Sequence, residues 1–203
     1  MWLALFFVGY IIAFFIIEKH TPTEGYWLTD IPFDDKIPFI PQFIWAYILW
    51  YPLFVAVGVP LMVGDGPAFK RWMYYMMTVL TATLIFDVLL PNGQGQRPVG
   101  MEITGPSTWM LARIWGADTP TNVFPSMHVL GCIGDILGVL DSKIFGKGYR
   151  ALIIVLSLLC SMSTVLVKQH AIVDTAGALI FALPAFLLFY RKRFLSGREH
   201  TLE

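Results

Sequence analysis

The chain has 203 residues, of which 57% are hydrophobic and only 14% are charged. Soluble domains carry about 25% charged residues, and a chain of this size cannot bury so much apolar surface while keeping a polar exterior. The composition therefore excludes an ordinary soluble domain and predicts an integral membrane protein. Fourteen basic residues balance fourteen acidic ones, so no cationic surface for nucleic acid is expected.

Six apolar segments follow one another along the chain, and most are near the roughly 20 residues that cross a bilayer core. No repeat or interdomain linker is visible, so we expect one all-α domain over residues 1–203, a bundle of six transmembrane helices. The predicted spans are Trp2–Ile17, Phe43–Val63, Trp72–Leu90, Phe124–Leu140, Ala151–Val167 and Ala171–Tyr190.

Lysine and arginine are distributed unevenly between the two sides of this bundle. Because cytoplasmic loops carry the excess of positive charge, both termini are predicted to be cytoplasmic and residues 91–123 to lie outside. The predicted cytoplasmic side holds Lys70, Arg71, Lys143, Lys147, Arg150, Arg191, Lys192, Arg193 and Arg198, and the outer side holds Lys19, Lys36, Arg97, Arg113 and Lys168.

The two long outer connections differ in kind. Residues 18–42 contain four prolines among aromatic residues and predict an irregular cap, whereas residues 91–98 form a turn-rich run that cannot continue a helix. A short amphipathic helix is expected near Ser107–Trp115. Only a few residues separate the fifth and sixth spans, so these two must form a tight helical hairpin.

Three polar clusters fall at the outer end of the predicted bundle, at residues 94–98, 124–128 and 163–174. Ionisable groups at membrane depth are costly and by default indicate function. The two cysteines, Cys132 and Cys160, lie within apolar runs, and no Cys/His spacing suggests a metal site.

His170 and Asp174 are four residues apart at the head of the sixth span and therefore share a helix face. The aspartate can accept the proton of one imidazole nitrogen, which leaves the other nitrogen bare as a nucleophile. The alternative is a polar pair that only satisfies itself between helices.

Ser126 and His128 belong to a Pro-Ser-Met-His sequence that is typical of a helix start, where free amides and the positive dipole end suit a phosphate. A histidine in that first turn could protonate a leaving alkoxide. The alternative is an ordinary capped helix with an interfacial histidine. Arg97 can hold phosphate oxygens in a bidentate fork or, alternatively, pair with lipid headgroups.

In this order the clusters resemble the signature of the type 2 phosphatidic acid phosphatase (PAP2) superfamily, which also contains lipid phosphotransferases and vanadium haloperoxidases. That signature is a lysine and an Arg-Pro, then Pro-Ser-Gly-His, then Ser-Arg followed by a histidine and, four residues later, an aspartate. The matching residues are Arg97-Pro98, Pro125 to His128, and Ser163 with His170 and Asp174. The resemblance covers about residues 72–190.

The resemblance implies a six-helix bundle of the PAP2 type and a reaction that needs no metal or cofactor. His170 would attack phosphorus to form a phosphohistidine, Asp174 would orient it, and His128 would protonate the leaving oxygen. The expected partners are a lipid phosphate or phospholipid and membrane lipids, in a bacterial plasma membrane with the active site on the outer face. The phosphate oxygens would be held by Arg97, Ser126, Lys168, Ser163, Thr164 and Gln96.

The chain departs from the family pattern where Leu90 replaces a lysine, Thr164 an arginine and Met127 a glycine. Lys168 lies one turn beyond Thr164 and could supply a missing charge. A less charged pocket suits phosphodiesters, so a lipid phosphotransferase is the second hypothesis after a lipid phosphatase. A non-catalytic lipid binder or transporter is the third, which the intact histidines disfavour.

Two aspartates and four glycines within the apolar segments suggest structural roles. Asp135 lies seven residues after His128, on the same helix face, and we expect a hydrogen bond between helices rather than a partner for the histidine. Asp87 is expected to behave similarly. The glycines, which allow close helix packing, are Gly131, Gly134, Gly138 and Gly177.

Overall fold

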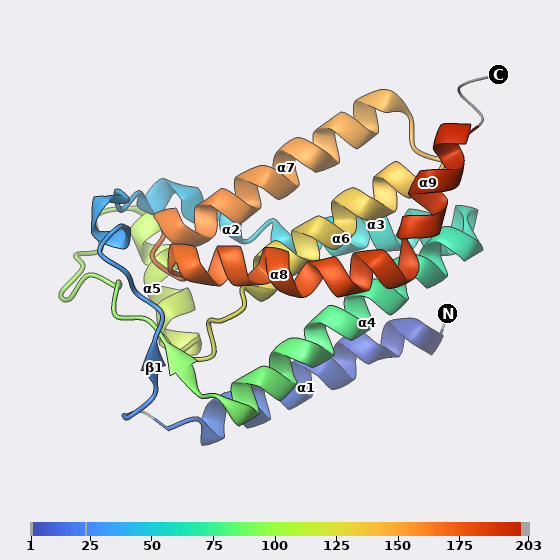
Figure 1. The fold of residues 1–203 in the computed structure, drawn as a ribbon. Coiled ribbons are helices and arrows are strands. Elements are labelled where there is room, and N and C mark those ends of the chain that lie inside the picture. Colours follow the sequence, from blue (N-terminus) through green and yellow to red (C-terminus); the bar gives the residue numbers. More distant parts are fainter. Residues whose placement is uncertain (1, 23, 200–203) are drawn as a thin grey trace.

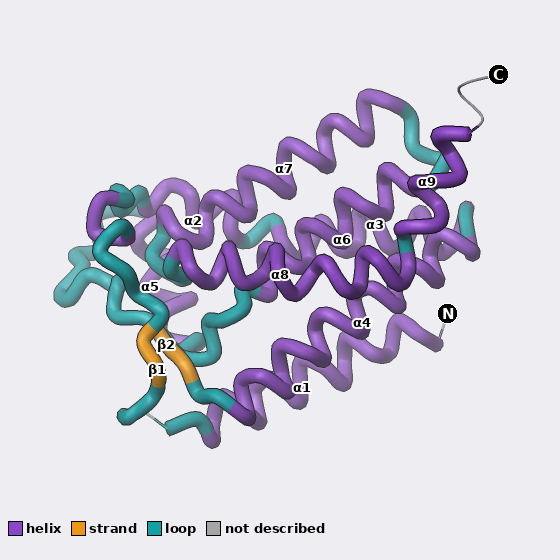
Figure 2. The backbone as a smooth tube through the Cα atoms, viewed as in Figure 1, coloured by secondary structure: helices purple, strands orange, loops and turns teal. Residues whose placement is uncertain are grey.

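The computed structural model describes residues 2–22 and 24–199 as a bundle of helices closed at one end by loops (Figure 1; Figure 2). The helices are α1 (Leu5–His20), α2 (Ile44–Tyr47), α3 (Trp50–Gly64), α4 (Gly66–Leu89), α5 (Pro106–Ala117), α6 (Met127–Asp141), α7 (Lys147–Leu166), α8 (Ile172–Phe189) and α9 (Arg191–Glu199). Short elements are the 3₁₀ turns η1 (Trp2–Ala4), η2 (Asp34–Lys36) and η3 (Pro41–Phe43) and the strands β1 (Trp27–Leu28) and β2 (Asn92–Gly93).

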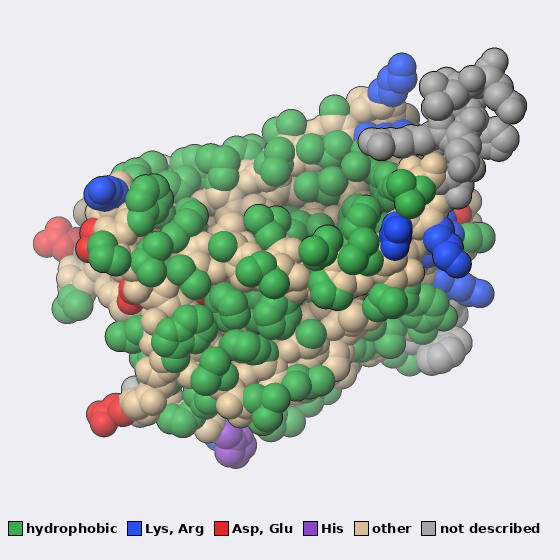
Figure 3. Space-filling model, viewed as in Figure 1, with side chains coloured by type: hydrophobic (Ala, Val, Ile, Leu, Met, Phe, Trp, Pro, Cys, Tyr) green, Lys and Arg blue, Asp and Glu red, His purple; other side chains and the backbone are tan. Residues whose placement is uncertain are grey.

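Four helical segments in the described residues are long and apolar enough to cross a membrane. They are Pro41–Gly64, which joins η3, α2 and α3, and the helices α4, α7 and α8. Helices α1 and α6, of 16 and 15 residues, are shorter than these and run along the same bundle (Figure 1). Figure 3 shows hydrophobic side chains over most of the visible flank and several Lys and Arg side chains near α9. These features agree with the predicted all-α membrane protein.

Helix α6 forms the centre of the bundle and packs against α3, α4, α7 and α8. Its glycines allow this close approach: a Cβ atom added to Gly131 would lie 2.5 Å from Trp50 Nε1, and one added to Gly138 would lie 2.9 Å from Trp72 Cδ1. Gly134 faces α4 in the same way. The predicted packing role of these glycines is therefore confirmed.

Several span boundaries differ from those predicted. Helix α4 begins at Gly66 rather than Trp72, because Asp65 caps it with a 3.1 Å bond from Ala68 N to Oδ1 and Pro67 occupies the first turn. Helix α6 begins at Met127, three residues later than predicted. The second span is divided into α2 and α3 at residues 48–49.

The loop end of the bundle is tied together by a small feature that was not predicted. Strands β1 and β2 pair in parallel, with Trp27 opposite Asn92. The Asn92 side chain accepts bonds from Val123 N (2.9 Å) and Phe124 N (2.8 Å) through Oδ1. These contacts join the irregular cap, which the sequence predicted, to the start of α6. Helix α5 confirms the predicted amphipathic helix.

The buried aspartates hold helices together. Asp135 Oδ1 accepts a 3.2 Å bond from Trp72 Nε1, which links α6 to α4 as predicted. Asp87 does not bridge helices as expected but accepts from the side chain of Asn92 in β2, at 3.2 Å. At the opposite end of the bundle, Asp141 forms ion pairs with Arg71 (2.7 Å) and Arg193 (3.0 Å), so that α4, α6 and α9 meet on one carboxylate.

Candidate active site

Helix α6 begins with the capping residue that its sequence predicted. Ser126 is the N-cap residue with an extended backbone, and its hydroxyl oxygen lies 3.5 Å from Val129 N. The Ser126 amide donates to the carbonyl of Asp174 at 3.1 Å. This bond joins the start of α6 to the start of α8 and brings His128, in the first turn of α6, near His170.

The link between α7 and α8 forms the predicted tight hairpin over residues 167–171. Lys168 has a left-handed backbone with φ of 55°, and the amides of Gln169 and His170 both donate to the carbonyl of Thr164, at 3.0 and 3.1 Å. The Asp174 carboxylate caps α8 by accepting from Ala171 N at 2.8 Å. The hairpin therefore fixes the backbone on both sides of His170.

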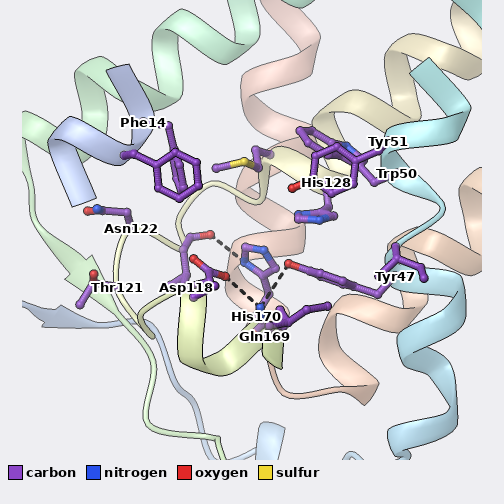
Figure 4. A pocket seen from close by; sticks show the side chains of 16 residues that line it. Phe14, Tyr47, Trp50, Tyr51, Asp118, Thr121, Asn122, His128, Gln169 and His170 are labelled. Carbon is purple, nitrogen blue, oxygen red and sulfur yellow. Dashed lines mark hydrogen bonds between the residues drawn. The ribbon is translucent and has the colours of Figure 1, made fainter. Parts of the chain in front are cut away.

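The His170 side chain is oriented by two oxygen acceptors on one nitrogen. Nδ1 lies 2.9 Å from the Val123 carbonyl oxygen and 3.3 Å from Asp174 Oδ2. Because both groups accept hydrogen bonds, they favour the tautomer with its proton on Nδ1. The Nε2 lone pair is then free for chemistry on the cavity that His170 lines (Figure 4).

His128 is held by rings rather than by hydrogen bonds. Its imidazole stacks on Tyr47 with 4.1 Å between ring centroids and lies 4.7 Å from the Trp50 ring. Neither ring nitrogen has a hydrogen-bond partner among the described residues. The His128 and His170 rings are 5.9 Å apart, which leaves two imidazoles near one another in a single cavity.

We name this space, of about 180 Å³, the histidine cavity. Figure 4 shows His128, His170, Asp118 and Gln169 around it, with aromatic side chains on the other sides. The walls come from α1, α2, α3, α5, α6 and the α7–α8 link. The lining residues are Phe14, Phe15, Tyr47, Ile48, Trp50, Tyr51, Ile114, Ala117, Asp118, Thr121, Asn122, Val123, Met127, His128, Gln169 and His170.

Arg97 reaches this cavity through two residues that line it. Its guanidinium donates to Gln169 Oε1 at 2.6 Å and to the Asp118 carbonyl at 2.8 Å, and Gln169 Nε2 donates to Asp118 Oδ2 at 2.9 Å. The guanidinium carbon also lies 5.6 Å from the Trp115 ring centroid. These contacts hold the cation directly behind the cavity wall.

Burial shifts the pKa values of both Asp118 and Arg97. Desolvation raises the pKa of Asp118 to about 6, and the negative charge of Glu18 adds to this effect while Arg97 opposes it. Desolvation also lowers the pKa of Arg97, against the attraction of Asp118. The Asp118 carboxyl therefore changes its charge within the physiological range, on the wall of the histidine cavity.

The other residues expected to hold phosphate do not line the histidine cavity. The Lys168 ammonium donates to the Asp34 carbonyl at 2.9 Å and to Gln96 Oε1 at 3.3 Å. Ser163 and Thr164 are fully buried, and their hydroxyls donate to carbonyls three residues earlier in α7. Ser126 is likewise buried in its capping position. Of the predicted site residues, His128 and His170 line the cavity, while Asp174 and Arg97 each contact a residue that does.

Sequence reasoning did not single out Asp118, Tyr47 or Gln169 as site residues. Gln169 is adjacent to His170, so its position was the only available signal. Asp118 lies just beyond α5 and Tyr47 lies in an apolar run, and only the fold brings them beside the histidines. Neither Asp118 nor Tyr47 belongs to a motif, which explains why the sequence did not mark them.

Within residues 2–22 and 24–199, no three His, Cys, Asp or Glu side chains come together in a way that could hold a metal ion. Comparison of the chain with protein-family models, with curated proteins and with solved structures finds no match. The geometry of the histidine cavity and the sequence motifs are therefore the features that bear on the function of this chain.

Proposed function

We propose that this protein is a PAP2-type membrane lipid phosphatase that works through a phosphohistidine intermediate. The observation that carries the proposal is the pair of imidazoles 5.9 Å apart in one cavity, of which His170 has its Nδ1 held by two oxygen acceptors. A positioned base next to an oriented nucleophile is the arrangement that covalent catalysis requires.

The reaction proceeds in two displacements. Nε2 of His170 attacks phosphorus as the bond to the lipid oxygen breaks, and His128, which enters this step as an imidazolium, gives a proton to that leaving oxygen. Neutral His128 then takes a proton from water, and the resulting hydroxide oxygen attacks phosphorus as the bond between phosphorus and Nε2 of His170 breaks. Inorganic phosphate leaves, and both imidazoles regain their starting protonation.

Charge on the phosphate is balanced by groups around the cavity. Arg97 is the cation connected to the cavity wall, through Gln169 and Asp118. The first amides of α6 supply a positive dipole end next to His128. In this proposal Lys168, Gln96, Ser163 and Thr164 hold the loops and the hairpin in place rather than contact phosphate.

The proposed membrane arrangement follows the charge distribution. Helices α1 and α6 cross together with the four longer segments, giving six spans with both termini in the cytoplasm. The histidine cavity then faces the outer side of a bacterial plasma membrane, at the depth of lipid headgroups.

A lipid phosphotransferase is the second candidate, and one observation favours it. Among the described residues, those that line the histidine cavity include no lysine or arginine, which suits a phosphodiester with one negative charge better than a dianionic monoester. In this case an acceptor alcohol replaces water in the second displacement.

The test is a substrate panel with the purified protein in detergent. Phosphatidate, lysophosphatidate, isoprenyl diphosphate and diacyl phospholipids are compared, with and without a lipid alcohol acceptor. Release of free phosphate supports the phosphatase, and transfer of the headgroup to the acceptor supports the phosphotransferase. Tight lipid binding without either product would contradict both and favour a non-catalytic lipid binder.

A further inference from the structure

A second cavity, of about 350 Å³, opens on the flank of the bundle between α1 and α3. Its sides are formed by residues such as Phe7 and Ile11 of α1 and Val55 and Val59 of α3, and its floor by Trp72 of α4. The lining is almost entirely apolar. We call this space the α1–α3 groove.

The groove exists because of how three helices pack. Helices α1 and α3 each pack against α4 and meet one another through the Phe7 and Phe54 rings, whose centroids are 5.4 Å apart. Gly58 of α3 allows the Trp72 ring to approach the helix closely, since an added Cβ would lie 2.8 Å from Trp72 Cη2. Val55 and Val59, 62% and 48% exposed, border the opening and leave it accessible from the side.

The groove lies next to the histidine cavity. Trp50 and Tyr51 line both spaces and therefore stand between them. On the α1 side, Tyr10 of the groove donates to the Met127 sulfur of the cavity at 3.5 Å. A lipid whose phosphate lies in the cavity therefore has the apolar groove beside it.

The groove runs in the direction that the hydrocarbon chain of a lipid would take if its phosphate lay in the histidine cavity. Helices α1 and α3 lie antiparallel, so the groove follows α3 from Trp50 toward Met62 and α1 back from Ile11 toward Ala4. With a rise of 1.5 Å per residue, Trp50 to Met62 covers about 18 Å. That is somewhat more than half of the roughly 30 Å hydrocarbon core of a bilayer.

We propose that the α1–α3 groove binds one hydrocarbon chain of the substrate lipid while the phosphate of that lipid lies in the histidine cavity. The apolar lining excludes water and favours the chain through burial of apolar surface. The lateral opening allows the lipid to enter from the membrane without leaving it. This inference rests on the proposed function and adds a binding site for the hydrocarbon chain of the lipid.

The test compares a long-chain and a water-soluble dihexanoyl phosphatidate in a variant that fills the groove. Val59→Trp places a ring at the groove border and should lower the ratio of kcat/KM for the long-chain over the short-chain substrate by about tenfold or more. The matched control is Leu183→Trp on α8, a similarly exposed residue outside the groove, which should leave the ratio as in the wild type. Equal ratios in all three proteins would overturn the proposal.

A second measurement does not depend on turnover. A phosphatidate with a photoreactive group near the end of one acyl chain is cross-linked to the wild-type protein, and the modified residues are identified by mass spectrometry. Modification concentrated on residues that line the groove, and reduced by Val59→Trp, supports the chain site. Modification spread equally over α8 would overturn it. Absence of turnover together with concentrated cross-links would contradict the proposed catalytic function but not the groove.

Discussion

Two histidines share one cavity, and their surroundings differ in a way that suits different tasks. His170 has oxygen acceptors on Nδ1, and these fix both the ring orientation and the tautomer. His128 is instead sandwiched by the Tyr47 and Trp50 rings and keeps both nitrogens unbonded in the described chain. The first environment orients a nucleophile, and the second leaves both His128 nitrogens without a protein partner among the described residues beside the cavity.

Lys168→Met tests whether the buried ammonium supports the structure or binds phosphate. The substitution removes the ammonium from Gln96 Oε1 and from the Asp34 carbonyl, which keeps its bond from Ile37 N. The loss of such a donor typically costs about 1–3 kcal/mol. We expect a lower thermal unfolding temperature in detergent and a change of less than about threefold in KM for a short-chain phosphate ester. Lys36→Met, at an exposed lysine of η2, is the matched control.

A hundredfold rise in KM for Lys168→Met, without loss of stability, would contradict this account. That result would instead mean that the Lys168 ammonium turns toward the bound phosphate. It would then replace the arginine that PAP2 proteins have at the position of Thr164.

Asp118 gives a prediction about pH. Burial raises the pKa of Asp118 to about 6, so its negative charge appears on the cavity wall as the pH rises from 5 to 7. That charge repels phosphate, and Asp118→Asn should therefore lower KM severalfold at pH 7 and have little effect at pH 5. Substrate ionisation is the same for both proteins and cancels in the ratio of their KM values. A ratio that is constant between pH 5 and 7 would contradict the prediction.

At the scale of helices, local sequence signals predicted those elements that depend on local chemistry. The Ser126 cap, the short α7–α8 link and α5 all follow from nearby residues. The pairing of β1 with β2 joins residues about 65 positions apart and has no local signal. The break between α2 and α3 could not be predicted either, because both helices lie in one continuous apolar segment. Hydrophobicity alone does not distinguish one helix from two.

Gly177 is the element-scale test of how α8 approaches the start of α6. An added Cβ at this position would collide with the Phe124 ring, and Phe124 lies two residues before Ser126. Gly177→Ala should push the helix starts apart, destabilise the protein by about 1–3 kcal/mol and lower kcat. Gly148→Ala in α7 is the control, because nothing lies within 4 Å of an added Cβ there. This variant should keep the stability and the kcat of the wild type. Full activity in Gly177→Ala would show that this contact does not position the histidines.

At the scale of the whole molecule, composition predicted the class of protein and the motifs predicted the histidine pair and Asp174. The surroundings of that pair could not be predicted, because they come from α1, α2, α3, α5 and residues 118–123, which carry no motif. The partner of Lys168 could not be predicted either. Its spacing from Thr164 suggests a role at the phosphate, but in the fold its ammonium donates to the carbonyl of Asp34, which is distant in sequence.

Topology is tested by the accessibility of introduced cysteines. Val99 is fully exposed in the 91–123 connection, and Gly146 lies at the opposite end, before α7. In intact bacteria a membrane-impermeant maleimide should label Val99→Cys, and should label Gly146→Cys only after permeabilisation. Both native cysteines are buried and should not react. Labelling of Gly146→Cys alone in intact cells would mean that the orientation is reversed.

The central claim is that His170 carries the phosphoryl group during turnover. The most direct measurement is rapid acid-free denaturation of the protein after mixing with ³²P-labelled phosphatidate, followed by mass spectrometry of the labelled peptide. We predict an acid-labile, base-stable phosphate on His170 in wild type, a longer-lived one in His128→Ala, and none in His170→Ala, which should also lose turnover. Turnover above about a tenth of wild type in His170→Ala, or label on another residue, would contradict the account.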